Sequence, residues 1–164
     1  MFRFLIVFLG LVSSFGFASS AQADQPSYDG SRGNPVVRAV YFHADWCANC
    51  RILQPELDKA KVSGKNLPVQ HITLDFTNPQ TWDAAIEIAL DNNVVAAYNA
   101  YAGTTGLVVL VAGDTGEQID CVNRLYTAPA MVHAFENAVQ RVRSTQPGNR
   151  NTGSIVCPPS RMAP

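Results

Sequence analysis

Apolar and polar positions along the chain follow two spacings, one typical of strands and one typical of helices. Runs rich in β-branched and aromatic residues predict strands at residues 36–42, 69–76, 107–111 and 117–125. Helical spacing or composition predicts helices at residues 51–61, 81–91 and 127–142. A turn at residues 113–116 joins the last two strands into a hairpin. The order of elements, β-α-β-α-β-β-α, indicates an α/β fold.

Individual residues indicate where these helices begin and which of their faces are buried. Asn78 and Pro79 suit the N-cap and first position of the second helix, whose predicted buried stripe is Ala84, Ala85, Ile88 and Ala89. Pro55 lies inside the first helix and predicts a kink or a break there. Residues 94–101 fit either further helix or an irregular approach to the next strand. Thr127 is the predicted cap of the last helix, whose apolar stripe predicts core packing by Met131, Val132, Phe135, Val139 and Val142.

The N-terminal segment predicts export. Arg3 gives a positive start, and residues 4–17 form an apolar run that is too short to span a membrane comfortably. Residues 21–23, Ala-Gln-Ala, match the small-x-small pattern that signal peptidase cleaves. The alternative is a transmembrane anchor. We expect cleavage after Ala23 and no stable membrane insertion of the mature chain.

The rest of the 164-residue chain fits one domain with short tails. We expect four parts: a signal peptide (1–23), a flexible leader (24–35), one globular domain (36–143) and a Pro- and Gly-rich tail (144–164). The formal net charge is −1, which gives no reason to expect nucleic acid as a partner.

Cys47 and Cys50 are spaced for dithiol chemistry. A Cys-x-x-Cys placed where a strand leads into a helix puts the first sulfur at the helix N-terminus, where free N–H groups stabilise a thiolate. The second sulfur lies one turn further and resolves a mixed disulfide. Cys47 is therefore the expected nucleophile and Cys50 the resolving thiol, with Trp46 as an apolar contact for a partner.

Three other interpretations of this pair remain open. The two cysteines could form a purely structural disulfide, although so small a ring constrains little of a fold. A zinc site would need two more ligands at a recognisable spacing. Copper(I) capture is the stronger rival, because soft thiolates suit that ion. We predict no cofactor and no metal ligand.

The run at residues 42–50, with Pro55 five residues after the second cysteine, resembles the thioredoxin active site. The resemblance covers about residues 35–143 and implies a thioredoxin-like fold, with a central mixed β-sheet flanked by helices. The Ala-Asp-Trp-Cys-x-x-Cys run, followed by residues 74–78, is most similar to the periplasmic reductase domain of DsbD-type proteins. That resemblance implies a periplasmic protein that exchanges electrons with protein disulfides and with a membrane or periplasmic electron donor.

The chain departs from the thioredoxin pattern at two places. The family places a proline before the strand at 107–111, where this chain has Gly-Thr-Thr-Gly at 103–106. Thr105 and Gly106 are therefore the candidate loop residues facing the sulfurs, and a non-catalytic interaction module becomes a further alternative. The family commonly has a buried acid where this chain has Tyr41, a weak substitute at neutral pH. His43 on the same strand face is a candidate for proton exchange, although the sequence alone favours a core histidine bonded to backbone.

Cys121 and Cys157 form the second predicted pair. Cys121 lies in the last predicted strand and Cys157 in the tail, which has no other evident means of ordering. Sequence alone allows three pairings of four cysteines. We favour a structural Cys121–Cys157 disulfide over a second redox pair that relays electrons from Cys50. The function that the sequence favours is thiol–disulfide exchange outside the cytoplasm, in the direction of reduction.

Overall fold

The computed structural model describes residues 35–161. One four-stranded sheet forms its centre, with strand order β2-β1-β3-β4. The strands are β1 (Val37–His43), β2 (Val69–Asp75), β3 (Leu107–Ala112) and β4 (Gln118–Asn123). The helices are α1 (Ala48–Ser63), α2 (Pro79–Asp91), α3 (Val95–Tyr101) and α4 (Ala128–Ser144).

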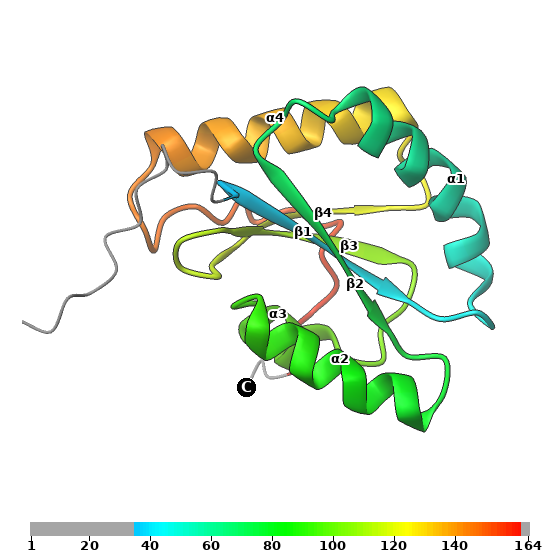
Figure 1. The fold of residues 1–164 in the computed structure, drawn as a ribbon. Helices are drawn as coiled ribbons and strands as arrows, with labels where there is room; N and C mark the ends of the chain where they lie inside the picture. The colour runs from blue at the N-terminus through cyan, green and yellow to red at the C-terminus, as the bar shows by residue number, and fades with distance from the viewer. Residues whose placement is uncertain (1–34, 162–164) are drawn as a thin grey trace, which may run out of the picture.

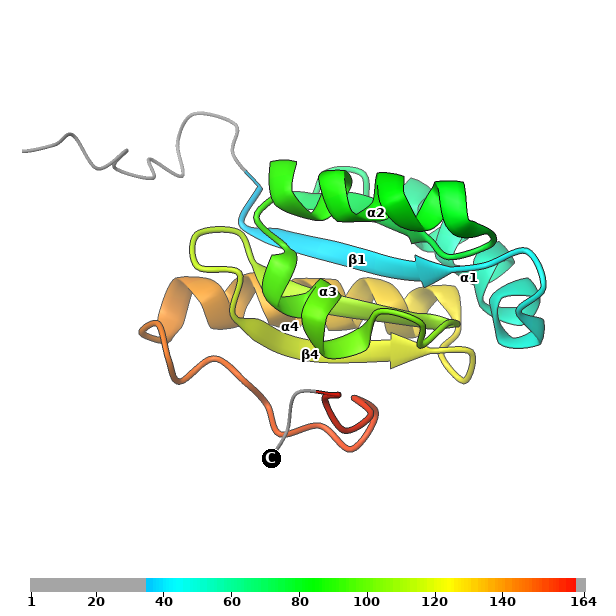
Figure 2. The same cartoon turned by 90° about the horizontal axis from the view of Figure 1, so that it is seen from below.

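The sheet is mixed and separates two helical layers (Figures 1 and 2). β1 pairs in parallel with β2, and antiparallel pairs join β1 to β3 and β3 to β4. Helices α1 and α4 share one core cluster with one face of the sheet, through residues such as Leu57 and Phe135. Helices α2 and α3 share the other cluster, through residues such as Ala85 and Tyr101. The predicted α/β class, a central mixed sheet with flanking helices, is confirmed.

The two central strands are the most buried segments. Six residues of β1 and all six of β3 are buried, because each strand has a neighbour on both sides and helices on both faces. Continuous apolar runs are the sequence signature of such strands. All four strands and the late hairpin therefore agree with the sequence pattern, with ends shifted by at most two residues.

Helix α2 confirms the predicted cap and corrects the predicted stripe. Asn78 is the N-cap and Pro79 opens the helix, with a capping box between Asn78 and Thr81. Of the four residues in the predicted stripe, two are buried, Ala85 and Ala89, which lie four positions apart. The predicted burial of Ala84 and Ile88 is wrong, since both are exposed. Aromatic side chains, rather than a wider helix face, complete this layer, and Phe76, Trp82 and Tyr98 pack against one another.

Helix α1 runs through Pro55 without a break, contrary to one of the two predicted outcomes. Leu53 and Leu57 are fully buried on either side of the proline, so packing holds the helix together despite the missing N–H. The ambiguous segment at 94–101 is helical as α3. Thr127 precedes α4 as predicted but makes no side-chain cap. Instead, Glu56 of α1 accepts a hydrogen bond from the backbone N–H of Ala128, at 2.7 Å.

The described part of the tail is attached to the domain by several contacts. A disulfide joins Cys157 to Cys121 of β4, with Cα atoms 5.1 Å apart, which is the pairing favoured from the sequence. The buried Arg150 side chain pairs with Asp114 in the β3–β4 turn. The backbone N–H of Thr152 donates to β4. These contacts hold the tail along the edge of the sheet (Figure 2).

The predicted signal peptide at 1–23 and nearly all of the leader at 24–35 lie outside the described residues. Within residues 35–161, no helix is long and apolar enough to cross a membrane.

Acidification should destabilise the fold through His71, whose ring packs against Phe135 with centroids 5.4 Å apart. Burial, and secondarily the charge of Lys61, lowers the pKa of His71 to about 4 from its ordinary 6.5. The unfolded chain therefore takes up this proton first, and the free energy of unfolding falls as the pH drops from about 6.5 towards 4. We expect His71→Gln to flatten this part of the pH profile in urea unfolding. His133→Gln, at an exposed position of α4, should leave the profile unchanged. Equal slopes for His71→Gln and the unsubstituted protein would contradict the assignment.

Removing the tail disulfide should lower stability without changing the sulfur pair at Cys47 and Cys50. The bridge spans 36 positions, which corresponds to about 3–4 kcal/mol on the chain-entropy model. We expect Cys157→Ser to lose free energy of unfolding on this scale in denaturant titrations. Ile155→Ala, a change at a fully exposed tail residue, is the matched control and should have almost no effect. Equal stabilities for the two variants would show that the tail is held by its other contacts.

Candidate active site

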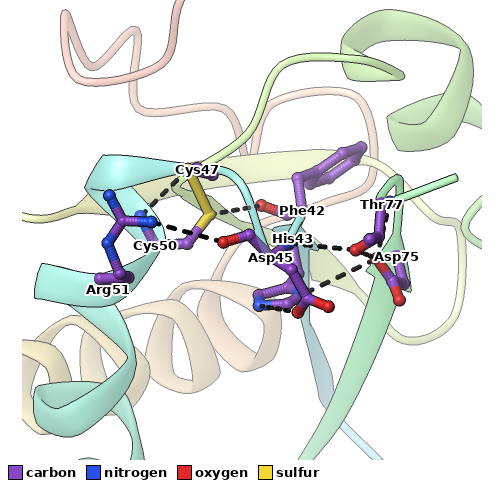
Figure 3. Close-up of a disulfide and its surroundings, with 8 residues drawn as sticks. All are labelled: Phe42, His43, Asp45, Cys47, Cys50, Arg51, Asp75 and Thr77. Atoms are coloured by element: carbon purple, nitrogen blue, oxygen red, sulfur yellow. Dashed lines mark hydrogen bonds and ion pairs between the residues drawn. A yellow bond between two sulfur atoms is a disulfide. The ribbon is translucent and has the colours of Figure 1, made fainter.

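Cys47 lies at the start of α1, directly after the loop that leaves β1 (Figure 3). It is the N-cap residue, with an extended backbone, and its sulfur accepts a hydrogen bond from the Cys50 N–H at 3.0 Å. N-cap side chains satisfy one of the free N–H groups at a helix start. The structure holds Cys47 and Cys50 as a disulfide, with Cα atoms 5.2 Å apart. The backbone thus directs a hydrogen-bond donor at the first sulfur, where negative charge develops when the disulfide is reduced.

The two sulfurs differ in their surroundings. Cys47 is 5% exposed, whereas Cys50 is 1% exposed and lies under the helix start. The Cys50 sulfur lies 3.9 Å from the backbone oxygen of Phe42 in β1, within range for the weak hydrogen bond that a thiol donates. Cys47 is therefore the less buried residue of the pair.

Thr77, just after β2, holds the loop that carries Asp45 and Trp46 (Figure 3). Its hydroxyl accepts a hydrogen bond from the Asp45 N–H at 3.0 Å and donates to Asp75. The Thr77 backbone oxygen accepts from the indole N–H of Trp46 at 3.2 Å. Trp46 remains 60% exposed next to the cysteines, with its polar end fixed. A rigid, exposed aromatic ring of this kind is suited to contact with another protein.

Gly106, before β3, approaches the cysteines from the opposite side. Its N–H donates to the Phe42 oxygen at 2.9 Å, and its φ is +79°. A Cβ at this position would lie 2.5 Å from the Cβ of Asn49 and 3.4 Å from the sulfur of Cys47. Only glycine combines this backbone conformation with this close approach. Gly106 is thus placed where the sequence analysis expected it, and the half-buried Thr105 precedes it in the same loop.

Tyr41 and His43 lie on the face of β1 that points towards α1. Their rings contact edge to face, with centroids 5.4 Å apart. Tyr41 is buried, and its hydroxyl has no hydrogen-bond partner among the described residues. Burial, and secondarily the charge of Asp58, raises the pKa of Tyr41 to about 12. Tyr41 is therefore neutral throughout the physiological range.

His43 lies between two carboxylates. Its Nδ1 is 3.6 Å from Asp75 Oδ1, and its Nε2 is 4.0 Å from Asp45 Oδ1. Burial raises the pKa of Asp75, but hydrogen bonds from Thr77 and the nearby His43 outweigh it, so the net shift is downward. The side chain of His43 also lines an open cavity of about 480 Å³, which we call the Cys50 cavity; its walls include Asp45, Cys50, Arg51, Gln54 and Asp58.

Sequence reasoning missed Asp75, Thr77 and Asp58 as parts of the site. Asp75 ends β2 and Thr77 follows it, so both reach the site only through the parallel pairing of β1 with β2. Asp58 lies two turns beyond Cys50 on α1, and nothing in its sequence neighbourhood marks it. The described residues contain no group of three or more His, Cys, Asp and Glu side chains placed to hold a metal ion.

The family model described as Thioredoxin matches residues 32–96, a range that contains β1, the cysteine pair, α1 and β2. Comparison with curated proteins finds no match. The chain thus has a thioredoxin-like fold that carries a Cys-x-x-Cys pair at the start of α1.

Three solved structures similar to this chain come from different organisms. Trxlp of Edwardsiella tarda EIB202 is 14% identical with a TM-score of 0.42, and the match covers 63% of this chain and 84% of that one. The oxidised thioredoxin of Plasmodium falciparum is 15% identical with a TM-score of 0.40, covering 66% and 88%. The zinc-bound form of human ERp44 is 18% identical with a TM-score of 0.42, covering 65% and 28%.

Gly106→Ala should disturb the site because the new methyl group would meet Asn49 at 2.5 Å. Gly148→Ala is a matched control, since Gly148 also has a positive φ, +88°, but has nothing within 4 Å of the new carbon. Both variants carry the cost of a left-handed residue, and we expect Gly106→Ala to lose about 1–3 kcal/mol more. Thermal and urea unfolding measure the difference, and alkylation of reduced Cys47 reports the local disturbance. Equal losses for both variants would show that the loop moves away freely.

Proposed function

We propose that the protein is a thiol–disulfide oxidoreductase in which Cys47 attacks a disulfide of another protein and Cys50 releases the product. The observation that carries this proposal is the Cys50 N–H directed at the Cys47 sulfur, at the N-terminus of a 16-residue helix. A helix start with this donor stabilises the thiolate that acts as nucleophile. The different exposure of the two sulfurs supports the division of roles.

The partner in this proposal is a disulfide-containing polypeptide that contacts Trp46 and the loop carrying Thr105 and Gly106. Trp46 directly precedes Cys47 and exposes its indole, and Gly106 approaches the Cys47 sulfur closely. A flat, partly apolar surface of this kind suits an extended chain better than a small molecule, which requires a deeper pocket. A separate electron donor returns the pair to the dithiol state after each turnover.

We propose that the protein works in the periplasm and in the direction of reduction, as in the DsbD-type domain that its active-site run resembles. The signal-like segment at 1–23 supports export. The second disulfide, between Cys121 and Cys157, is of the kind that persists in oxidising compartments. Ala48 and Asn49 between the cysteines bring no positive charge that would stabilise the thiolate further, which favours a reductant over a strong oxidant.

Cys50→Ser should accumulate a mixed disulfide between Cys47 and a protein substrate, because the resolving thiol is absent. Cys47→Ser should form none and should lose activity in a disulfide-reduction assay. The mature chain, equilibrated with glutathione, should show a Cys47–Cys50 potential near or below about −230 mV. Mass spectrometry after acid quenching measures all three results.

Each contrary result has a definite meaning. A potential near −120 mV would make the protein an oxidant. Stoichiometric copper(I) binding without any disulfide exchange would replace the proposal by a metal-binding role. Inert cysteines together with stable binding of a partner protein would indicate an interaction module.

A further inference from the structure

Release of a partner requires Cys50 to lose a proton inside the protein. Cys50 attacks as a thiolate, yet this residue is only 1% exposed, in the first turn of α1. Burial in apolar surroundings disfavours the thiolate. A group that accepts the proton must therefore lie within reach of Cys50, directly or across a solvent-accessible space.

The Cys50 cavity provides that space, and His43 lines it together with Cys50. We propose that His43 accepts the proton that the Cys50 thiol loses when Cys50 resolves the mixed disulfide, an inference that rests on the exchange reaction proposed above. The side chain of His43 is 23% exposed, so it is both held by the protein and open to the cavity. Imidazole is the side chain whose ordinary pKa lies nearest to neutral pH, which suits it to reversible proton transfer.

The other titratable groups around His43 are less suited to this step. On β1, Tyr41 has its pKa raised to about 12, and it holds its own proton at neutral pH. The guanidinium of Arg51 on α1 has hydrogen-bond donors only and cannot accept the proton. The carboxylates that line the cavity, Asp45 and Asp58, have side chains 78% and 57% exposed, so they are much more open to solvent than the His43 ring.

Asp75 of β2 acts on His43 and not on the sulfur. Its Oδ1 faces Nδ1 of the ring at 3.6 Å and is fixed by two hydrogen bonds from Thr77. With Asp45 on the other side of the ring, a proton accepted by His43 is placed between two negative charges. Asp75 is thus a positioning residue, oriented by the same threonine that holds the Trp46 loop.

Resolution of the mixed disulfide begins with a proton transfer. The Cys50 S–H bond breaks and its proton passes to the His43 ring. The Cys50 thiolate attacks the Cys47 sulfur, forming the Cys47–Cys50 bond as the bond between Cys47 and the partner breaks. The partner leaves as a thiolate and takes up a proton, returned from His43 through the cavity. The protein dithiol has then been oxidised by two electrons and the partner disulfide reduced by two.

Rapid mixing of the reduced full chain with excess glutathione disulfide, followed by acid quenching and mass spectrometry, separates attack from resolution. We expect His43→Gln to accumulate the glutathione mixed disulfide and to resolve it about 10- to 100-fold more slowly at pH 7. The deficit should shrink as the pH rises towards 9, because hydroxide then removes the thiol proton. Alkylation of Cys47 by iodoacetamide should proceed at an unchanged rate, which shows that the helix start is intact.

Tyr41→Phe and His133→Gln, the latter at an exposed position of α4, are the controls, and each should resolve the mixed disulfide within about twofold of the unsubstituted rate. Asp58→Asn tests the carboxylate that lines the cavity. If His43→Gln is poorly folded, His43→Ala with added imidazole replaces it, since the enlarged cavity admits the free base. Restoration of the resolution rate by imidazole is then the expected result.

Three outcomes would overturn the inference. One is resolution of the mixed disulfide by His43→Gln at the unsubstituted rate at every pH. Another is an Asp58→Asn variant that reproduces the whole deficit, which would transfer the role to that carboxylate. Failure of imidazole to restore a slow, folded His43→Ala variant would equally contradict proton transfer. Failure of the proposed function itself is distinguishable, because the unsubstituted chain would then form no Cys47–Cys50 disulfide from glutathione disulfide, and both proposals would fall together.

Discussion

β1 pairs with β2 on one side and with β3 on the other, and the whole candidate site depends on this double pairing. The chain leaves β1 at His43 and reaches Cys47 within four residues. At the same edge of the sheet, the parallel register places Asp75 of β2 opposite His43. The antiparallel pairing with β3 brings Gly106 to the Phe42 oxygen. Backbone hydrogen bonds therefore fix three loops around one sulfur pair, and the side chains need little further organisation.

The two disulfides constrain the molecule in different ways. The Cys47–Cys50 bridge closes a ring within one helical turn, so opening it removes little conformational restraint. The Cys121–Cys157 bridge closes a long loop and attaches the tail to β4, whose outer edge would otherwise present unpaired backbone groups. The first arrangement is compatible with repeated reduction and oxidation. The Cys121–Cys157 disulfide, in which Cys121 is fully buried, is suited to remaining oxidised.

Much of the fold could be predicted from the sequence because its strands are continuous apolar runs and its second helix carries a cap at Asn78. Tertiary packing explains the features that the local sequence pattern did not predict. Pro55 remains inside α1 because leucines on both sides are buried. Ile88 is exposed because aromatic residues, distant in sequence, fill the layer beside α2.

The candidate site, like the fold, has some residues that the sequence predicts and others that only the structure shows. Cys47, Cys50 and Gly106 follow from a motif and from its spacing to the next strand. Asp75 enters only through the strand register, since it lies 32 positions after His43. Asp58 enters only because one face of α1 lines the Cys50 cavity. Such neighbours are set by tertiary geometry, and no local pattern predicts them.

The opposite surroundings of the two sulfurs give a physical reason for an ordered reaction. Cys47 lies beside Gly106 and the exposed Trp46, where a polypeptide has access, and receives a backbone hydrogen bond that favours its charged form. Cys50 is almost fully buried, and it lines a cavity together with His43. If attack by Cys47 is set by the helix start and release by Cys50 is set by the cavity, the two steps respond to pH through different groups. A change of pH that slows one step then leaves the other unchanged. This separation arises because β1 ends between β2 and β3.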